Sequence, residues 1–194
     1  MKDSLPSVLT DIRACRICRD LPLGPGPVLR ASSEARLLVC GQAPGTKAHE
    51  TNTPWNDRSG DVLRNWLGLD RHVFYDERLV AIVPMGFCYP GRDAKGGDRP
   101  PRKACAEHWH GRLLPLLSGV RTVLLVGGHA QKYHLGDACR PTLTETVRRW
   151  RAYGPRRWPL PHPSWRNTGW LRRNPWFEEE LLPALRRHLG EVLA

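Results

Sequence analysis

The chain has 194 residues, of which 30 are Lys or Arg and 19 are Asp or Glu, so its formal net charge is +11 at pH 7. This length is ample for one sizeable core, and we expect a single domain over residues 1–194. No basic and apolar leader opens the chain and no apolar run approaches a membrane span, so we expect a cytoplasmic protein that does not enter the membrane. Arginine carries almost all of the excess charge and binds phosphate well, which makes a polyanion the leading partner and a merely solvated basic surface the alternative.

Helices are expected in several segments that are separated by apolar strands. A short amphipathic helix over residues 5–13 runs into Cys15-Arg16-Ile17-Cys18. Apolar residues then recur at helical spacing over 61–67, with Ser59 as a possible N-cap. A further helix is expected from Cys105 through Leu117, and a short one after the third strand ends at His134. Two more are expected, one over 142–150 with Thr142 and Glu145 in capping-box spacing, and one from about Asn174 onward. The Gly-, Pro- and charge-rich segment 89–102 is expected to be a loop.

Four short apolar runs predict strands. They lie at residues 37–40, 79–84, 121–126 and 158–160, and their continuous apolar character is typical of strands buried on both faces of a parallel sheet. Strands that alternate with helices predict an α/β fold, a single-domain doubly wound sheet of about four parallel strands flanked by helices.

The chemistry-bearing loops follow these strands directly. The first strand ends in Gly41-Gln42-Ala43-Pro44-Gly45, the second in Pro84-Met85-Gly86, the third in Gly127-Gly128-His129 and the fourth in His162-Pro163-Ser164. In an open parallel sheet, ligands bind beyond the carboxyl ends of the strands. We therefore expect one site at this edge, where glycine lets the backbone approach a ligand closely.

Four of the six cysteines form two pairs, Cys15 with Cys18 and Cys88 with Cys105. Six cysteines without a secretory leader argue against a disulfide scaffold and favour metal binding or chemistry. Four thiolates can hold tetrahedral zinc or a four-iron cluster, and ordinary free thiols remain the alternative. Cys40, in a buried strand, and Cys139, in a polar turn, are expected to have no such role.

Two motifs in order, together with the four cysteines, carry a resemblance to a known family. With Gly41-Gln42-Ala43-Pro44-Gly45, the following Pro54-Trp55 and the later His162-Pro163-Ser164, the chain resembles the uracil-DNA glycosylase superfamily, and it is most similar to the iron–sulfur bacterial and archaeal branches. The form His-Pro-Ser-Trp-Arg-Asn is closer to the single-strand-selective glycosylases, which indicates a divergent branch. The resemblance covers nearly the whole chain from Cys15 to the final helix.

The resemblance implies excision of uracil from DNA, single- or double-stranded, by a monofunctional glycosylase that we expect to be a monomer. It implies a [4Fe–4S] cluster on Cys15, Cys18, Cys88 and Cys105. Trp55 matches the aromatic residue that stacks on the extruded base, and His162 matches the histidine that binds the leaving uracil. The residues from Pro163 to Arg166 match a loop that enters the minor groove.

Two positions differ from the family pattern: the first bears on the general base and the second on how the uracil edge is read. Gln42 stands where the iron–sulfur type commonly has Glu, and Pro84 stands near the position of an Asn that usually reads the uracil edge. The catalytic candidates are therefore His162, Gln42, Glu50 and Asp57. The expected substrate-binding residues are Gly41, Gln42, Ala43, Trp55, Met85, Gly86, His129, Ser164, Arg166 and Asn167, with helix capping as the alternative for His129.

Two other functions compete with this one. A non-catalytic nucleic-acid-binding protein that keeps the fold is favoured by Gln42 and Pro84. A zinc-stabilised enzyme acting on small nucleotides is disfavoured by the arginine excess. The densest basic run, Arg148, Arg149, Arg151, Arg156 and Arg157, is expected to bind phosphate, with an affinity that falls steeply with salt.

Overall fold

The computed structural model describes residues 3–94 and 96–194 and contains one sheet of four parallel strands. These are β1 (Leu37–Cys40), β2 (Val80–Ile82), β3 (Thr122–Val126) and β4 (Arg157–Leu160), in the order β2-β1-β3-β4. The predicted number, location and parallel direction of the strands are confirmed. Because the chain moves from β1 to β2 on one side and then to β3 on the other, the strand order reverses at β1, which is where open α/β sheets bind ligands.

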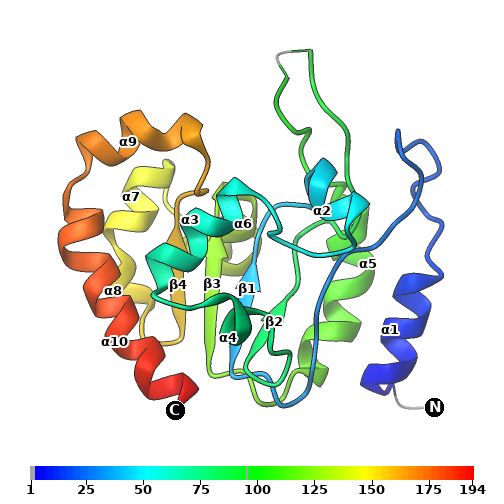
Figure 1. Ribbon diagram of the computed structural model, residues 1–194, viewed down its shortest axis with the longest axis horizontal. Coiled ribbons are helices and arrows are strands. Elements are labelled where there is room, and N and C mark those ends of the chain that lie inside the picture. The colour runs from blue at the N-terminus through cyan, green and yellow to red at the C-terminus, as the bar shows by residue number, and fades with distance from the viewer. Residues whose placement is uncertain (1–2, 95) are drawn as a thin grey trace.

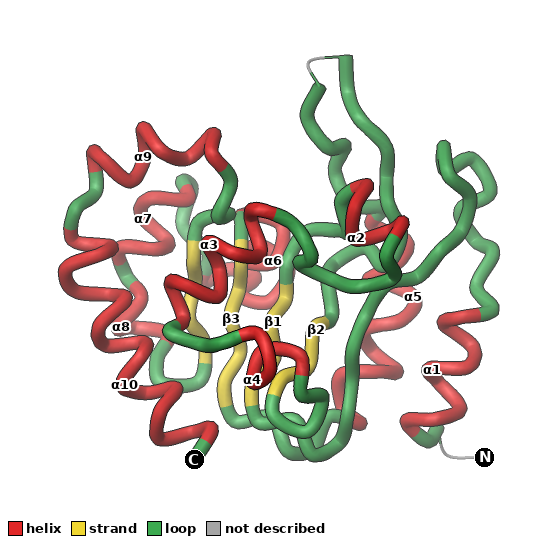
Figure 2. Tube along the Cα trace, in the orientation of Figure 1, coloured by secondary structure: helices red, strands yellow, loops and turns green. Residues whose placement is uncertain are grey.

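Ten α-helices surround the sheet in the described part of the chain (Figures 1 and 2). They are α1 (Leu5–Arg13), α2 (Thr46–Glu50), α3 (Arg58–Leu67), α4 (Arg71–Tyr75), α5 (Lys103–Leu113), α6 (Gly128–Leu135), α7 (Leu143–Arg148), α8 (Trp150–Tyr153), α9 (Thr168–Arg173) and α10 (Leu182–Leu193). Short 3₁₀ turns lie at Leu114–Leu116, Gly136–Ala138 and Trp165–Asn167, and a π-helical turn at Phe177–Leu181 precedes α10.

Strand β1 separates two hydrophobic cores. Successive side chains of a strand point to opposite faces of the sheet. Leu37 and Val39 pack in one core with Leu63 of α3, whereas Leu38 packs in the other with Trp109 of α5. All four β1 residues are buried, which explains why the strand is apolar throughout and does not alternate.

Several helix boundaries differ from the prediction. The N-cap of α3 is Asp57 and not Ser59, since the Asp57 side chain accepts a hydrogen bond from the Gly60 N–H at 2.9 Å. The expected helix over 142–150 is two helices that meet at Arg149, although the capping box of Thr142 and Glu145 is confirmed. Helices α2, α4 and α9 were not expected, because segments of five or six residues are too short to show a periodic pattern.

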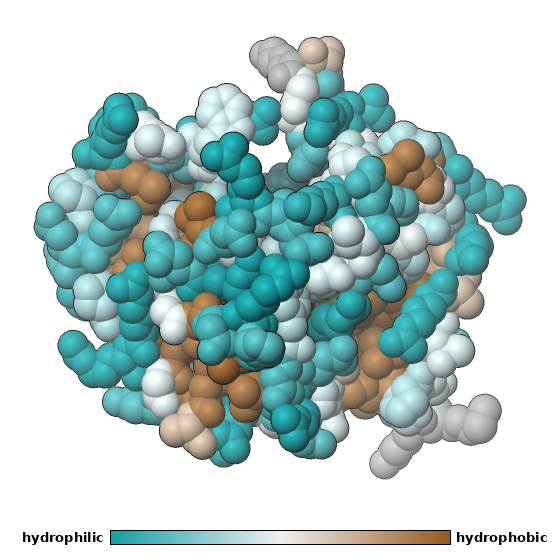
Figure 3. Space-filling model, viewed as in Figure 1, coloured by the Kyte–Doolittle hydropathy of each residue, from teal (hydrophilic) through white to brown (hydrophobic). Residues whose placement is uncertain are grey.

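The surface visible in Figure 3 is mostly hydrophilic, with apolar residues showing in separate patches. Within residues 3–94 and 96–194, no helix is long and apolar enough to cross a bilayer.

Candidate active site

A pocket of about 400 Å³ opens at the carboxyl edge of the sheet. It lies beyond β1 and β4, at the place that the strand order predicts. The structure brings nine of the predicted site residues together around this pocket: Gly41, Gln42, Ala43, Trp55, Asp57, His162, Ser164, Arg166 and Asn167.

Four other predicted residues lie outside the pocket lining. Glu50, at the end of α2, is exposed and does not line the pocket. The backbone N–H groups of Met85 and Gly86 donate to the carbonyls of Gly41 and Gln42, both at 2.9 Å, and so extend the sheet instead of facing a ligand. His129 lies in the first turn of α6 and does not line the pocket either.

Trp55 is held in a constrained conformation beside His162. Its φ of 56° is in the left-handed region, which non-glycine residues rarely adopt and which is often found at functional sites. Its carbonyl accepts a hydrogen bond from the buried Arg64 at 3.2 Å, and its ring centroid lies 5.5 Å from that of His162. The indole therefore forms one wall of the pocket in a fixed orientation.

Two glycines make room for this tryptophan. A methyl group on Gly41 would lie 2.7 Å from the Trp55 ring, and one on Gly60 would lie 1.7 Å from the Trp55 carbonyl oxygen. The second clash is with backbone, which cannot rotate away. Gly60 is thus required by the close approach of α3 to the loop that carries Trp55.

Gly60→Ala should destabilise the protein although alanine favours helix. Because the backbone of Trp55 must shift, we expect a loss of about 1–3 kcal/mol in the free energy of unfolding, measured by chemical denaturation. Gly111→Ala in α5 is the matched control: nothing lies within 4 Å of the added methyl group, so this variant should gain up to about 1 kcal/mol. Equal effects of the two substitutions would contradict the packing argument.

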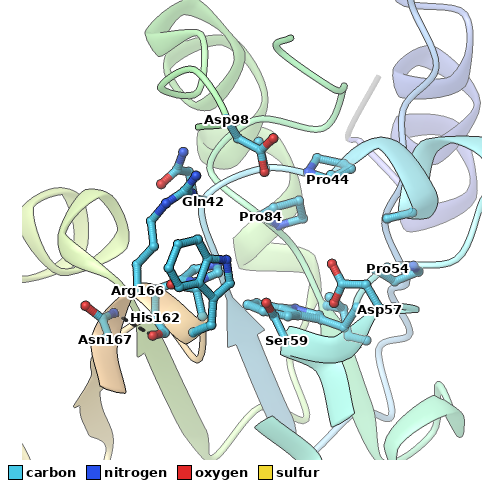
Figure 4. A pocket seen from close by; sticks show the side chains of 18 residues that line it. Gln42, Pro44, Pro54, Asp57, Ser59, Pro84, Asp98, His162, Arg166 and Asn167 are labelled. Atoms are coloured by element: carbon cyan, nitrogen blue, oxygen red, sulfur yellow. Dashed lines mark hydrogen bonds between the residues drawn. The ribbon is translucent and has the colours of Figure 1, made fainter. Parts of the chain in front are cut away.

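His162 enters the pocket on the loop after β4. Its carbonyl accepts hydrogen bonds from the Asn167 side chain at 2.7 Å and the Ser164 N–H at 2.9 Å, so the loop folds back on itself (Figure 4). Burial lowers the pKa of His162, and the nearby carboxylates of Asp57 and Asp98 oppose this shift. The imidazole is accordingly neutral at pH 7, when one ring nitrogen carries a hydrogen that can be donated.

Gln42 and Asp57 each use one polar atom for structure. The side-chain Nε2 of Gln42 donates to the Arg99 carbonyl at 3.1 Å, and Oδ1 of Asp57 accepts the capping hydrogen bond of α3. Gln42 keeps its single side-chain oxygen, Oε1, and Asp57 keeps its second oxygen, Oδ2, for other contacts. Both side chains line the pocket and are positioned to hold a water molecule.

Asp98, which is not among the predicted site residues, also lines the pocket. This residue belongs to segment 89–102, which was expected to be a loop. No sequence signal marks Asp98. Its position depends on hydrogen bonds that join its segment to Gln42 and Arg166, which are far away in the sequence.

The four predicted cysteines line a second, small cavity. Cys15 and Cys18 follow α1, while Cys88 and Cys105 flank segment 89–102, and all four thiols face this cavity together with apolar residues such as Leu21 and Trp109. All six cysteines are free thiols. Sequence segments about seventy residues apart therefore converge at one place.

Four thiols around one cavity are a donor set that suits a four-iron cluster or a zinc ion. Among the described residues, no three His, Cys, Asp or Glu side chains are close enough to hold one metal ion. A four-iron cluster takes one thiolate on each of four separate irons, so its ligands need not meet at a point. The Phe87 N–H donates to the Cys105 sulfur at 3.3 Å, a contact that stabilises a thiolate ligand. Burial raises the pKa of Cys105 to about 12, so its free thiol is protonated at pH 7.

The densest basic run does not border the pocket. Arg156 and Arg157 precede or begin β4, whereas His162 follows its other end, so these arginines lie at the opposite edge of the sheet. Arg166 lies at the pocket, and Arg172 and Arg173 follow on the exposed side of α9. Phosphate contacts near the site would thus come from the arginines after His162.

The comparison with protein families agrees with this geometry. The family model described as the uracil DNA glycosylase superfamily matches residues 30–186. The matched range includes β1, the loop after it, Trp55, the complete sheet and His162. The match covers far more than half of the chain, and the protein therefore belongs to the uracil-DNA glycosylase superfamily.

Proposed function

We propose that this protein is a monofunctional DNA glycosylase that removes uracil and leaves an abasic site. The observation that carries the proposal is that Trp55 and His162 lie beside one another in the lining of one pocket, at 5.5 Å between ring centroids, in a chain of this superfamily. An aromatic ring that can stack and a neutral hydrogen-bond donor beside it in the same pocket suit a flat, polar base.

A base inside a duplex cannot reach this pocket, so it has to be rotated out of the stack at a cost of a few kcal/mol. Trp55 would recover part of that cost by stacking on the extruded base. Trp165 is 79% exposed beside the pocket, and the Arg166 guanidinium lies over its ring at 5.3 Å. This pair is suited to occupy the space that the base leaves, because an exposed aromatic side chain can insert between bases.

Cleavage of the glycosidic bond leaves negative charge on uracil and positive charge on the sugar. The ring N–H of His162 would donate to the uracil oxygen on which the negative charge develops. A neutral imidazole suits this role because its donor is already in place and needs no proton from solvent. Gln42 and Asp57 would hold the attacking water against the opposite side of the sugar.

We also propose that Cys15, Cys18, Cys88 and Cys105 hold a [4Fe–4S] cluster. When bound, the cluster would crosslink the segment after α1 to both ends of segment 89–102, and it would supply no electron to the hydrolysis. Support comes from the shared cavity and from the N–H group directed at the Cys105 sulfur.

The test of the function is a cleavage assay on oligonucleotides that carry uracil, hypoxanthine or xanthine. Excision of uracil, seen as alkali-labile abasic sites, is the expected result. Pro84 lines the pocket without a side-chain donor, so the other two bases show whether the site discriminates by hydrogen bonding or by shape alone. An enzyme that cleaves none of the three would contradict the proposal.

The second candidate is a non-catalytic nucleic-acid-binding protein with the same fold. Pro84 and Gln42 favour it, since neither supplies the side chain that the family pattern has at these positions. Tight binding to uracil-containing DNA with no release of base in the same assay would support this second function.

A further inference from the structure

Apart from residue 95, segment 89–102 forms a hairpin that stands out from the body of the protein (Figure 1), and its Asp98 lines the pocket. Arg92 and Asp98 pair as an isolated antiparallel bridge within it. Two hydrogen bonds tie the hairpin to the pocket: Gln42 Nε2 donates to the Arg99 carbonyl at 3.1 Å, and Arg166 donates to the Gly96 carbonyl at 3.3 Å. The hairpin is thereby fixed to the loops that follow β1 and β4.

This attachment places a second carboxylate opposite Asp57. A methyl group on Gly45 would lie 3.7 Å from Oδ2 of Asp98 and 3.8 Å from Oδ2 of Asp57, so both oxygens face the same small space. Figure 4 shows the two carboxylates directed toward the centre of the pocket that His162 lines. They also act on His162 electrostatically, because each opposes the lowering of its pKa by burial.

The two carboxylates differ in how their oxygens are used. Oδ1 of Asp57 accepts the capping hydrogen bond from the Gly60 N–H. The structure gives the Asp98 side chain no hydrogen bond to any residue in 3–94 or 96–194, although the side chain lines the pocket. Both Asp98 oxygens are accordingly available to a water molecule, whereas Asp57 is partly committed to its helix.

We propose that Asp98 is the general base of the glycosylase reaction, an assignment that rests on the function proposed above. As the bond from C1′ of the sugar to the base nitrogen breaks, its electron pair leaves with the base, which His162 stabilises. The water oxygen bonds to C1′, and one water proton passes to the Asp98 carboxylate, which later loses it to solvent. Asp57 orients the same water and balances the positive charge on the sugar.

The experiment measures single-turnover excision and DNA affinity for the wild type and for Asp98→Asn. We expect the rate to fall at least about a hundredfold, the lower end of the range for general-base catalysis. DNA affinity should stay equal or increase, because the variant removes a negative charge near the phosphates. Asp98→Ala should recover part of its rate in added formate, a small carboxylate that can enter the vacated space.

Glu107→Gln is the matched control, since it removes an exposed carboxylate from α5, outside the pocket. It should excise at the wild-type rate. An Asp98→Asn rate within about threefold of wild type would overturn the assignment, and so would a slow Asp98→Ala that formate does not rescue. A wild-type enzyme that releases no base would instead overturn the glycosylase function itself. In that case the His162 pKa, measured by NMR titration, should still be lower in Asp98→Asn than in the wild type, because one of the two carboxylates that raise it is gone.

Discussion

His162→Ala should lower the single-turnover rate of uracil excision by at least about a hundredfold, the scale of losing one preorganised oxyanion donor. The imidazole is the donor that lines the pocket beside Trp55, and burial keeps it neutral. Because the developing uracil anion loses its partner in the transition state, the rate should change more than the DNA affinity. Rapid-quench measurements under enzyme excess separate the two quantities.

The controls for this prediction are a distant histidine and the neighbouring amide. His72→Ala changes an exposed residue of α4 that does not line the pocket, and it should keep the full rate. Gln42→Ala should cost less than His162→Ala, and Gln42→Glu should leave substantial activity, because a carboxylate stands there in related enzymes. If His162→Ala is nearly as fast as wild type while Asp57→Asn is inactive, the leaving-group role of His162 is wrong.

Anaerobically purified protein should be brown and carry about four iron atoms per chain, as expected of a cluster with four thiolate ligands. Cys105→Ser should abolish the iron and reduce solubility, since segments 15–18 and 89–102 then lose their crosslink. Iron and sulfide analysis together with the visible absorption spectrum measures the loss.

Cys139→Ser is the control for the iron content, because Cys139 lies elsewhere, within 3.7 Å of the Thr146 hydroxyl, and does not line the cavity of the four thiols. Its iron content should equal that of the wild type. Stoichiometric zinc without iron in the anaerobic preparation would be incompatible with the cluster.

The position of the pocket follows from features that are local in sequence. Each strand is a short, mostly apolar run, and the loops that carry Gly41 and His162 follow their strands directly. Since parallel strands place their carboxyl ends at one edge, the sequence pattern was enough to bring these loops together.

The composition of the pocket was predicted less completely, because loop residues a few positions apart can face different ways. Glu50 and Asp57 both follow the loop after β1, yet only Asp57 lines the pocket, where it also caps α3. Met85 and Gly86 lie at a strand end, but their N–H groups continue the sheet. Backbone pairing of this kind has no side-chain signature in the sequence.

The sequence by itself determined the α/β class, the four parallel strands and the edge at which the site lies, because apolar runs and glycine-rich turns act within a few residues. Only the tertiary structure decided that Asp98 joins the site. Its hairpin reaches the pocket through hydrogen bonds to Gln42 and Arg166, which lie 57 and 70 residues away from their partners Arg99 and Gly96. Contacts over such separations depend on the packing of the whole sheet and its helices, and no local pattern encodes them.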